Sequence, residues 1–185
     1  MILETIVSTM DAQGRPNFAP MGIRLEGERV LLRPFREAQT WKNLQEVPEG
    51  VVNFTDNVLL FARCAVGAFV PPHHPAAGVR GAVLDDVCSW KEFRVVERDL
   101  AEERGRFWAR VVTEGRAREF LGFNRGKHAV IEATIAATRV HLLGRAPVLE
   151  EITRLRPLVD KTGGPEEREA FAFLESRIKG GDHVD

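Results

Sequence analysis

The sequence predicts an α+β protein in which a strand-rich N-terminal part precedes a helical C-terminal part. Up to about residue 117, short runs enriched in Val, Ile, Thr and Phe are separated by turns that contain Gly and Asp. From residue 118 the chain is rich in Ala and keeps apolar residues at helical spacing. Strands followed by helices are typical of α+β folds. We therefore expect two domains, residues 1–117 and 118–185.

The first 55 residues predict strand, turn, strand, turn, strand, short helix and strand. Turns are expected at residues 11–14 and 26–27, where Asp and Gly supply the backbone freedom of tight reversals. The first strand alternates poorly between apolar and polar residues, so we expect it to be buried on both faces. Thr40 is the expected N-cap of the helix that contains Trp41.

Basic residues around the start of this helix suggest an anion site. Pro34 cannot donate to a β-ladder, so it belongs at a sheet edge or strand end, and Arg33 lies beside it. A helix N-terminus carries free N–H groups and partial positive charge, which favour a phosphate. Arg33, Arg36, Thr40 and Lys42 could converge on one phosphate, or they could be the solvated charges of an ordinary capped helix.

The middle of the chain predicts a helix, a loop and two further strands. Residues 90–96 and 106–112 alternate as strands, are joined by a hairpin at 99–105 and would close a barrel. Residues 56–62 predict a capped helix that packs under the barrel. Residues 68–82, rich in Pro and Gly, predict a loop that carries His73 and His74. This spacing matches no zinc pattern, so we expect a solvated or substrate-facing loop, or a lid, and no metal site.

Residues 121–143 predict one long helix with a polar stripe. On a helical wheel, Asn124, Arg125, His128, Glu132 and Arg139 fall within an arc of about 100°. A His and a Glu four residues apart can form a hydrogen bond, which makes His128 and Glu132 the best candidates for a catalytic pair. The alternative is a solvated stripe. Helices are also expected from residue 146 through 158 and over 166–179, as an antiparallel pair, and the tail 180–185 should fray.

Composition excludes several classes of function. The formal net charge of -1 gives no electrostatic reason to expect nucleic acid or an anionic membrane as a partner. No apolar run approaches the roughly 20 residues that a membrane-spanning helix needs, and no secretory signal is visible. The two cysteines, Cys64 and Cys88, lie in apolar surroundings. We therefore expect a cytoplasmic protein without disulfides.

Four motifs in order resemble a known superfamily. They are Gly-Arg-Pro-Asn-Phe-Ala-Pro at 14–20, Thr-Trp-Lys-Asn-Leu at 40–44, Val-Val-Asn at 51–53 and Cys-Ser-Trp-Lys-Glu-Phe-Arg-Val-Val at 88–96. This order resembles the FMN-binding split barrel of the flavin reductase and pyridoxamine-phosphate oxidase superfamily. Phe93 stands where that superfamily commonly has Cys. The segment 123–134 extends the resemblance to the domain-of-unknown-function family 447.

The resemblance implies an FMN-binding split β-barrel with a C-terminal α-helical subdomain. It also implies a homodimer with the flavin at the subunit interface, and a small-molecule substrate or electron donor. The residues expected to bind FMN are Asn17, Ala19, Pro20, Met21, Gly22, Arg33, Pro34, Thr40, Lys42, Asn43, Trp90, Asn124 and Arg125. The expected function is a flavin-dependent oxidoreductase of unknown substrate. The alternatives are a non-catalytic flavin carrier or sensor, and a protein of pterin-linked one-carbon metabolism.

Overall fold

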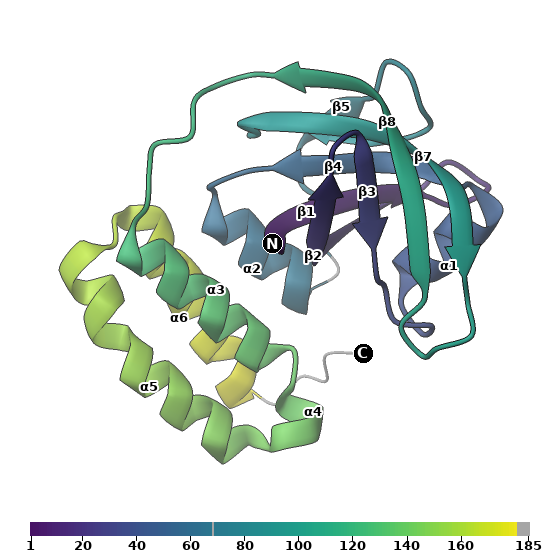
Figure 1. Ribbon diagram of the computed structural model, residues 1–185. Coiled ribbons are helices and arrows are strands. Elements are labelled where there is room, and N and C mark those ends of the chain that lie inside the picture. The colour runs from purple at the N-terminus through teal and green to yellow at the C-terminus, as the bar shows by residue number, and fades with distance from the viewer. Residues whose placement is uncertain (68, 181–185) are drawn as a thin grey trace. The chain divides into compact units, whose positions relative to one another are not determined.

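The computed structural model describes residues 1–67 and 69–180, and it confirms the α+β fold class (Figure 1). The chain forms two compact units, one built from Met1–Thr55 and Val70–Phe120, the other from Asp56–Phe69 and Leu121–Asp185. The first is the barrel unit and the second is the helical unit. Of the tail that we expected to fray, residues 181–185 lie outside the described ranges.

The barrel unit contains a closed antiparallel barrel in the order β1-β2-β3-β8-β7-β4. Its strands are β1 (Leu3–Met10), β2 (Pro16–Glu26), β3 (Arg29–Leu32), β4 (Glu49–Phe54), β7 (Ser89–Asp99) and β8 (Arg106–Arg116). The predicted turns are confirmed, with Gly14 and Gly27 at φ 81° and 63°, where a side chain would be strained. The long β7–β8 ladder has two register shifts, which bend it around the barrel.

The helix α1 (Gln39–Glu46) contributes to the barrel core. Trp41 and Leu44 are buried with Val7, Val52 and Phe107. Burying side chains of this size stabilises the fold by about 1.5–3 kcal/mol each. The indole of Trp41 meets the ring of Phe107 edge-on at 5.4 Å.

A small hairpin, β5 (His73–Pro75) and β6 (Ala82–Leu84), occupies the region that we expected to be an irregular loop. Polar side chains of the barrel hold it in place. The Ser8 hydroxyl and the Asn53 amide both donate to the carbonyl of Ala82, and Leu84 N donates to Asn53 Oδ1. Because the neighbouring residues Val7 and Val52 point into the barrel core, Ser8 and Asn53 point outward. The hairpin therefore covers an outer face of the barrel.

Glu92 is a second anchor for the same region. This carboxylate is buried and accepts hydrogen bonds from the backbone N–H groups of Ala77 and Gly78, at 3.2 and 2.6 Å. Bonds to a charged acceptor are stronger than those between neutral groups. The segment that links β5 to β6 is thus bonded to β7 through a side chain.

The helical unit contains α2 (Val58–Val66), α3 (Arg125–Ala137), α4 (Val140–Leu143), α5 (Arg145–Thr162) and α6 (Pro165–Gly180). Its core is a single cluster to which α2, α3, α5 and α6 all contribute, centred on Val130, Ile152, Phe171 and Leu174. The small residues Ala129, Ala133 and Ala137 are buried, which allows α3 to pack closely against its neighbours.

The helix expected near residue 56 is α2, which packs with α3 and α6 in the helical unit. Two expectations about other elements were wrong. The single helix over 121–143 is instead α3 and α4, interrupted at Thr138 and Arg139. Thr40 is not an N-cap: Ala38 holds that position without a side-chain bond, and the Thr40 side chain is buried within α1.

The described helices include none that combines the length and the apolar character needed to cross a membrane.

Replacing Gly105 with Ala should destabilise the barrel unit. An added Cβ would lie 2.0 Å from Cζ3 of Trp41, so the buried indole would have to move. We expect a loss of about 1–3 kcal/mol in the free energy of unfolding. All three tryptophans lie in the barrel unit, so denaturant unfolding followed by Trp fluorescence reports on this unit. Gly180→Ala is the control, because no heavy atom lies within 4 Å of its added Cβ. Equal stability of both variants would contradict the prediction.

Candidate functional site

A chain of hydrogen bonds connects α1 to the first two strands. Asn17 Nδ2 donates to Thr40 Oγ1 at 3.2 Å, and Asn43 Nδ2 donates to Thr9 Oγ1 at 3.0 Å. Gln39 Nε2 donates to Asn43 Oδ1 at 2.7 Å. Thr9, Thr40 and Asn43 are all buried. The structure therefore brings together three of the predicted cofactor residues, Asn17, Thr40 and Asn43, and fixes their side chains before any ligand arrives.

The predicted flavin-bordering residues of β2 lie along one strand that is only partly covered. Ala19, Pro20, Met21 and Gly22 are all half-buried. They pair in register with Val7, Ile6, Thr5 and Glu4 of β1. At Gly22 an added Cβ would lie 2.7 Å from Cγ2 of Ile2, so a larger residue would displace that side chain. This strand offers backbone and small side chains to a planar ligand.

Arg33 leaves the end of β3 and meets the β7–β8 hairpin. Its Nη2 lies 3.2 Å from Oε2 of Glu102, and its backbone carbonyl accepts from Nε and Nη2 of Arg104 at 3.3 and 3.2 Å. Arg33 Nε is buried and has no hydrogen-bond partner. A buried donor left unpaired costs about 1–3 kcal/mol, so this atom is a ready partner for an anion.

The other members of the predicted phosphate site have different surroundings. Pro34 is buried, whereas Lys42 is exposed on α1. Arg36 lies over the Trp41 ring at 5.7 Å and donates to the carbonyl of Leu100 at 2.9 Å. Since the Thr40 hydroxyl is already engaged by Asn17, Arg33 is the member with an unused buried donor.

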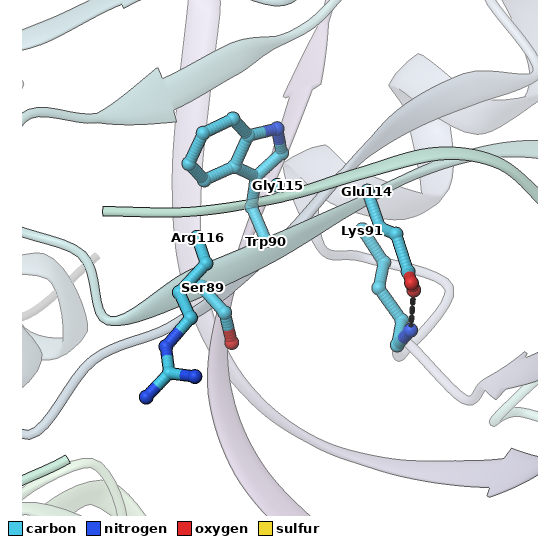
Figure 2. Close-up of a pocket in the computed structure, with 6 residues that line it drawn as sticks. All are labelled: Ser89, Trp90, Lys91, Glu114, Gly115 and Arg116. Atoms are coloured by element: carbon cyan, nitrogen blue, oxygen red, sulfur yellow. Dashed lines mark hydrogen bonds and ion pairs between the residues drawn. The ribbon is translucent and has the colours of Figure 1, made fainter. Parts of the chain in front are cut away.

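Trp90 lies beside a hollow of about 360 Å³ at the open end of the β7–β8 ladder (Figure 2). The hollow is lined by Ser89, Trp90, Lys91, Glu114, Gly115 and Arg116. The Trp90 indole covers Gly115, where an added Cβ would lie 2.1 Å from Cζ2. Its Nε1 is buried and has no partner.

Figure 2 shows Ser89 and Arg116 on one side of this ladder and the Lys91–Glu114 ion pair further along it. The hydrogen bond and charge of Lys91 lower the pKa of the Glu114 carboxyl, so this group is ionised at neutral pH. Trp90 and the 99–106 hairpin, which contacts Arg33, lie at opposite ends of the ladder, about 30 Å apart along the strand. The structure therefore does not bring Trp90 and Arg33 together.

The two adjacent histidines of β5 point to different partners. His74 Nδ1 lies 2.9 Å from Asp85 Oδ1, and its ring meets the Trp90 indole edge-on at 6.4 Å. His73 Nδ1 lies 2.8 Å from the carbonyl of Pro71, and its ring lies 5.1 Å from that of Phe18. The pairing of His74 with Asp85 was not predicted, because it depends on the pairing of β5 with β6 rather than on local spacing.

In the polar stripe, Asn124 is half-buried and the other members are exposed. Asn124 is the N-cap: its Oδ1 accepts from Lys127 N at 3.1 Å, and its Nδ2 donates to the carbonyl of Thr162 at 2.8 Å. Arg125, His128 and Glu132 are exposed. His128 contacts Phe123 edge-on at 6.0 Å, and within the described residues no hydrogen bond joins it to Glu132.

Lys127 was not predicted to have a role, but its side chain links three segments of the helical unit. Its Nζ lies 3.1 Å from Oε1 of the buried Glu167 and donates to the carbonyl of Asp56 at 2.6 Å. Burial opposes the ionisation of Glu167. However, hydrogen bonds from Lys127 and from the N–H of Gly164 outweigh this effect and leave the pKa of the carboxyl below its usual value.

The cysteines and the acidic side chains do not form a reactive thiol site or a metal site in the described part of the chain. Burial raises the pKa of the Cys64 thiol to about 12, so it is uncharged at neutral pH. Cys88 is buried, and its Sγ accepts from Arg118 Nη1 at 3.2 Å. Among residues 1–67 and 69–180, no three His, Cys, Asp or Glu side chains are grouped so that they could hold a metal ion.

Comparison with solved structures defines the class of the barrel. It resembles an FMN-binding protein from Thermus thermophilus with bound p-hydroxybenzaldehyde (TM-score 0.54, 15% identity, 62% of this chain and 71% of that one). It also resembles the styrene monooxygenase flavin reductase of Pseudomonas putida S12 (TM-score 0.54, 15% identity, 63% of this chain and 80% of that one). The fold is thus that of the flavin reductase-like split barrels, as predicted.

Both units together match one family. The model of the N-terminal domain of the protein of unknown function DUF447 matches residues 3–118, and the model of a second DUF447 region matches residues 124–176. The chain belongs to the DUF447 family. A crystal structure of the FMN-bound DUF447 protein MM1853 from Methanosarcina mazei is similar over 95% of this chain and 94% of that one, with 30% identity and a TM-score of 0.80.

Replacing Asn124 with Ala should destabilise the helical unit by about 1–3 kcal/mol, because it removes both a helix cap and the bond to Thr162. The helical unit contains no Trp, so circular dichroism during denaturant unfolding is the suitable measurement. Arg125→Ala is the matched control, since the exposed Arg125 should change stability by no more than about 0.5 kcal/mol. If Asn124→Ala were equally mild, its hydrogen bonds would not be needed for the fold.

Proposed function

We propose that the protein binds FMN and is a flavin-dependent oxidoreductase that acts on a small-molecule substrate or electron donor. The observation that carries this proposal is the 30% identity, over 95% of the chain, to an FMN-bound member of the same family. The likeness includes the helical unit as well as the barrel, so it goes beyond the fold that many flavin reductase-like proteins share.

The residues of this chain fit such a cofactor. β2 presents a half-buried strand at Ala19–Gly22, whose small residues leave room for a planar ring. Asn17, Thr40 and Asn43 are held in place by their own hydrogen bonds. Arg33 has a buried donor without a partner, which suits a phosphate oxygen. We assign Arg33 to the phosphate and residues 17–22 to the ring, with Pro34 and Lys42 nearby.

When bound, FMN supplies the redox chemistry. Residues 17–22 of β2 would bind and orient the ring and would exclude water from it. Backbone N–H groups directed at the ring would stabilise negative charge on it. Trp90, with its unpaired indole N–H, lies at the far end of the β7–β8 ladder, so we place it in a substrate-binding or partner-facing role within the same assembly.

The proposal includes a homodimer, as in the superfamily that the sequence resembles, and a cytoplasmic setting. Exposed apolar side chains such as Leu121 and Phe123 support further association. Sedimentation of the FMN-loaded protein tests the dimer: a species with the 20.7 kDa mass of one chain that still holds FMN would exclude it.

The absorption spectrum of the purified protein is the first test of the function. Flavin bands in the visible range, followed by their bleaching with a reduced nicotinamide or deazaflavin, would support an oxidoreductase. Tight flavin binding without turnover would indicate a carrier or sensor instead. A colourless protein that binds a pterin would contradict the FMN proposal.

Replacing Arg33 with Ala should weaken FMN binding by roughly tenfold to a hundredfold, since a charge-assisted hydrogen bond contributes about 1.5–3 kcal/mol. Riboflavin lacks the phosphate, so its affinity should change much less. Quenching of flavin fluorescence during titration measures both. Arg110→Ala removes an exposed Arg of β8, opposite Arg29 at the other end of β3, and should leave both affinities unchanged. Equal losses for FMN and riboflavin in Arg33→Ala would contradict the phosphate role.

We also propose that His128 and Glu132 act on the ligand. They are exposed polar residues on a helix whose other faces are largely buried, so their replacement should spare the fold. His128→Ala should lower turnover or shift flavin affinity while changing the free energy of unfolding by no more than about 0.5 kcal/mol. Steady-state kinetics with the FMN-loaded protein measures this. Wild-type turnover and wild-type FMN affinity in both His128→Ala and Glu132→Ala would identify the stripe as solvated.

A further inference from the structure

The carboxylate of Glu102 bridges two arginines at the end of the barrel where Arg33 emerges. Its Oε2 lies 3.2 Å from Nη2 of Arg33, and its Oε1 lies 2.5 Å from Nη2 of Arg106. Glu102 belongs to the β7–β8 hairpin and Arg33 follows β3, so 69 residues separate the two partners in the sequence. The guanidinium of Arg33, which we assign to the FMN phosphate, is therefore already paired with a carboxylate of the protein itself.

The backbone around this bridge is fixed. Arg36 N donates to the carbonyl of Glu103 at 2.9 Å, and Phe35 forms a β-bridge with Arg104. The guanidinium of Arg104 lies over the Phe35 ring at 4.5 Å and donates to the carbonyl of Arg33. These contacts hold the 33–36 segment against the hairpin. The Glu102 side chain can rotate away from Arg33 while the backbone of both segments stays in place.

We propose that Glu102 is a specificity-determining residue of the flavin site, where it acts as an internal competitor for the ligand's phosphate. The inference rests on the proposed FMN function. A phosphate monoester carries about -1.5 to -2 charges at neutral pH and has three acceptor oxygens. It displaces the single carboxylate from Arg33. Riboflavin ends in a neutral hydroxyl, so it leaves the Glu102–Arg33 pair intact.

Each contact of the bridge is partly exposed, so each is weak. The side chains of Arg33, Glu102 and Arg106 are 36%, 52% and 38% exposed. Exposed ion pairs of this kind typically alter an equilibrium by up to about fivefold. Glu102 therefore lowers FMN affinity modestly, and it does so only for ligands with a phosphate. The expected outcome is that FMN binds up to about fivefold more weakly than it would without the Glu102 charge, whereas riboflavin affinity is little affected.

The test is a comparison of FMN and riboflavin affinities in Glu102→Gln, measured by quenching of flavin fluorescence. Gln keeps the size of Glu and can still accept from Arg106, but it carries no charge. We expect FMN to bind about threefold to fivefold more tightly and riboflavin to bind within twofold of the wild type. Glu103→Gln is the matched control: it removes the same charge from the adjacent residue of the hairpin, which forms no ion pair in the described chain, and should leave both affinities unchanged.

A second arm separates displacement from general electrostatics. In a protein that already carries Arg33→Gln, Glu102→Gln should no longer improve FMN binding, because the guanidinium for which Glu102 and the phosphate compete is absent. An equal improvement with and without Arg33, or unchanged FMN affinity in Glu102→Gln, would overturn the inference while leaving FMN binding itself intact. Failure of the wild type to bind either flavin would overturn the proposed function together with the inference.

Discussion

The structure depends on the burial of β1 from both sides. This strand pairs with β2 along its whole length and with β4 over Ile6–Thr9, so it closes the barrel. Its inward side chain, Val7, belongs to the barrel core, and its outward side chain, Ser8, holds the β5–β6 hairpin. Thr9, at its end, accepts the hydrogen bond that fixes Asn43 of α1. A single strand thus sets the positions of the core, the outer hairpin and the helix beside the candidate site.

The polar groups of the barrel fall into two kinds. Ser8, Asn53 and Glu92 are buried and fully engaged with backbone groups of the β5–β6 region, so they specify where that region lies. Arg33 Nε and Trp90 Nε1 are buried and unengaged. Engaged groups account for the fold, whereas the unengaged ones are the places where a ligand or partner would gain most by binding. Hydrogen bonding alone therefore distinguishes the buried polar groups that hold the fold from those that are available to a ligand or partner.

Much of the fold could be predicted because its signals are local. The turns at Gly14 and Gly27, the strand pair around 99–105 and the C-terminal helix expected over 166–179 all depend on residues close together in the chain. The candidate site was only partly predictable. Asn17, Thr40 and Asn43 were all expected to bind FMN, but the hydrogen bond that Thr40 accepts from Asn17 depends on a contact across 23 residues.

The contacts that were not predicted have one common reason: they join residues that are far apart in the sequence. Glu102 meets Arg33, and Asp85 meets His74, only after strands have paired, so neither has a neighbour in the sequence that signals its role. The membership of α2 in the helical unit also follows from packing with α3 and α6, which no local pattern of α2 reveals. Asn124 was noticed as a polar residue near a helix start, but its tie to Thr162 depends on the position of α5.

The placement of α2 makes the helical unit discontinuous in sequence, and this affects how the protein can be made or divided. During synthesis α2 leaves the ribosome long before α3 and α6, so its apolar residues Val58, Ala62 and Val66 do not have all their partners until α6 is complete. A fragment that ends after the barrel at residue 120 would keep α2 but lose α3 and α6, which pack against it. Neither unit is one contiguous piece of the chain, so the barrel cannot be excised by a single cut.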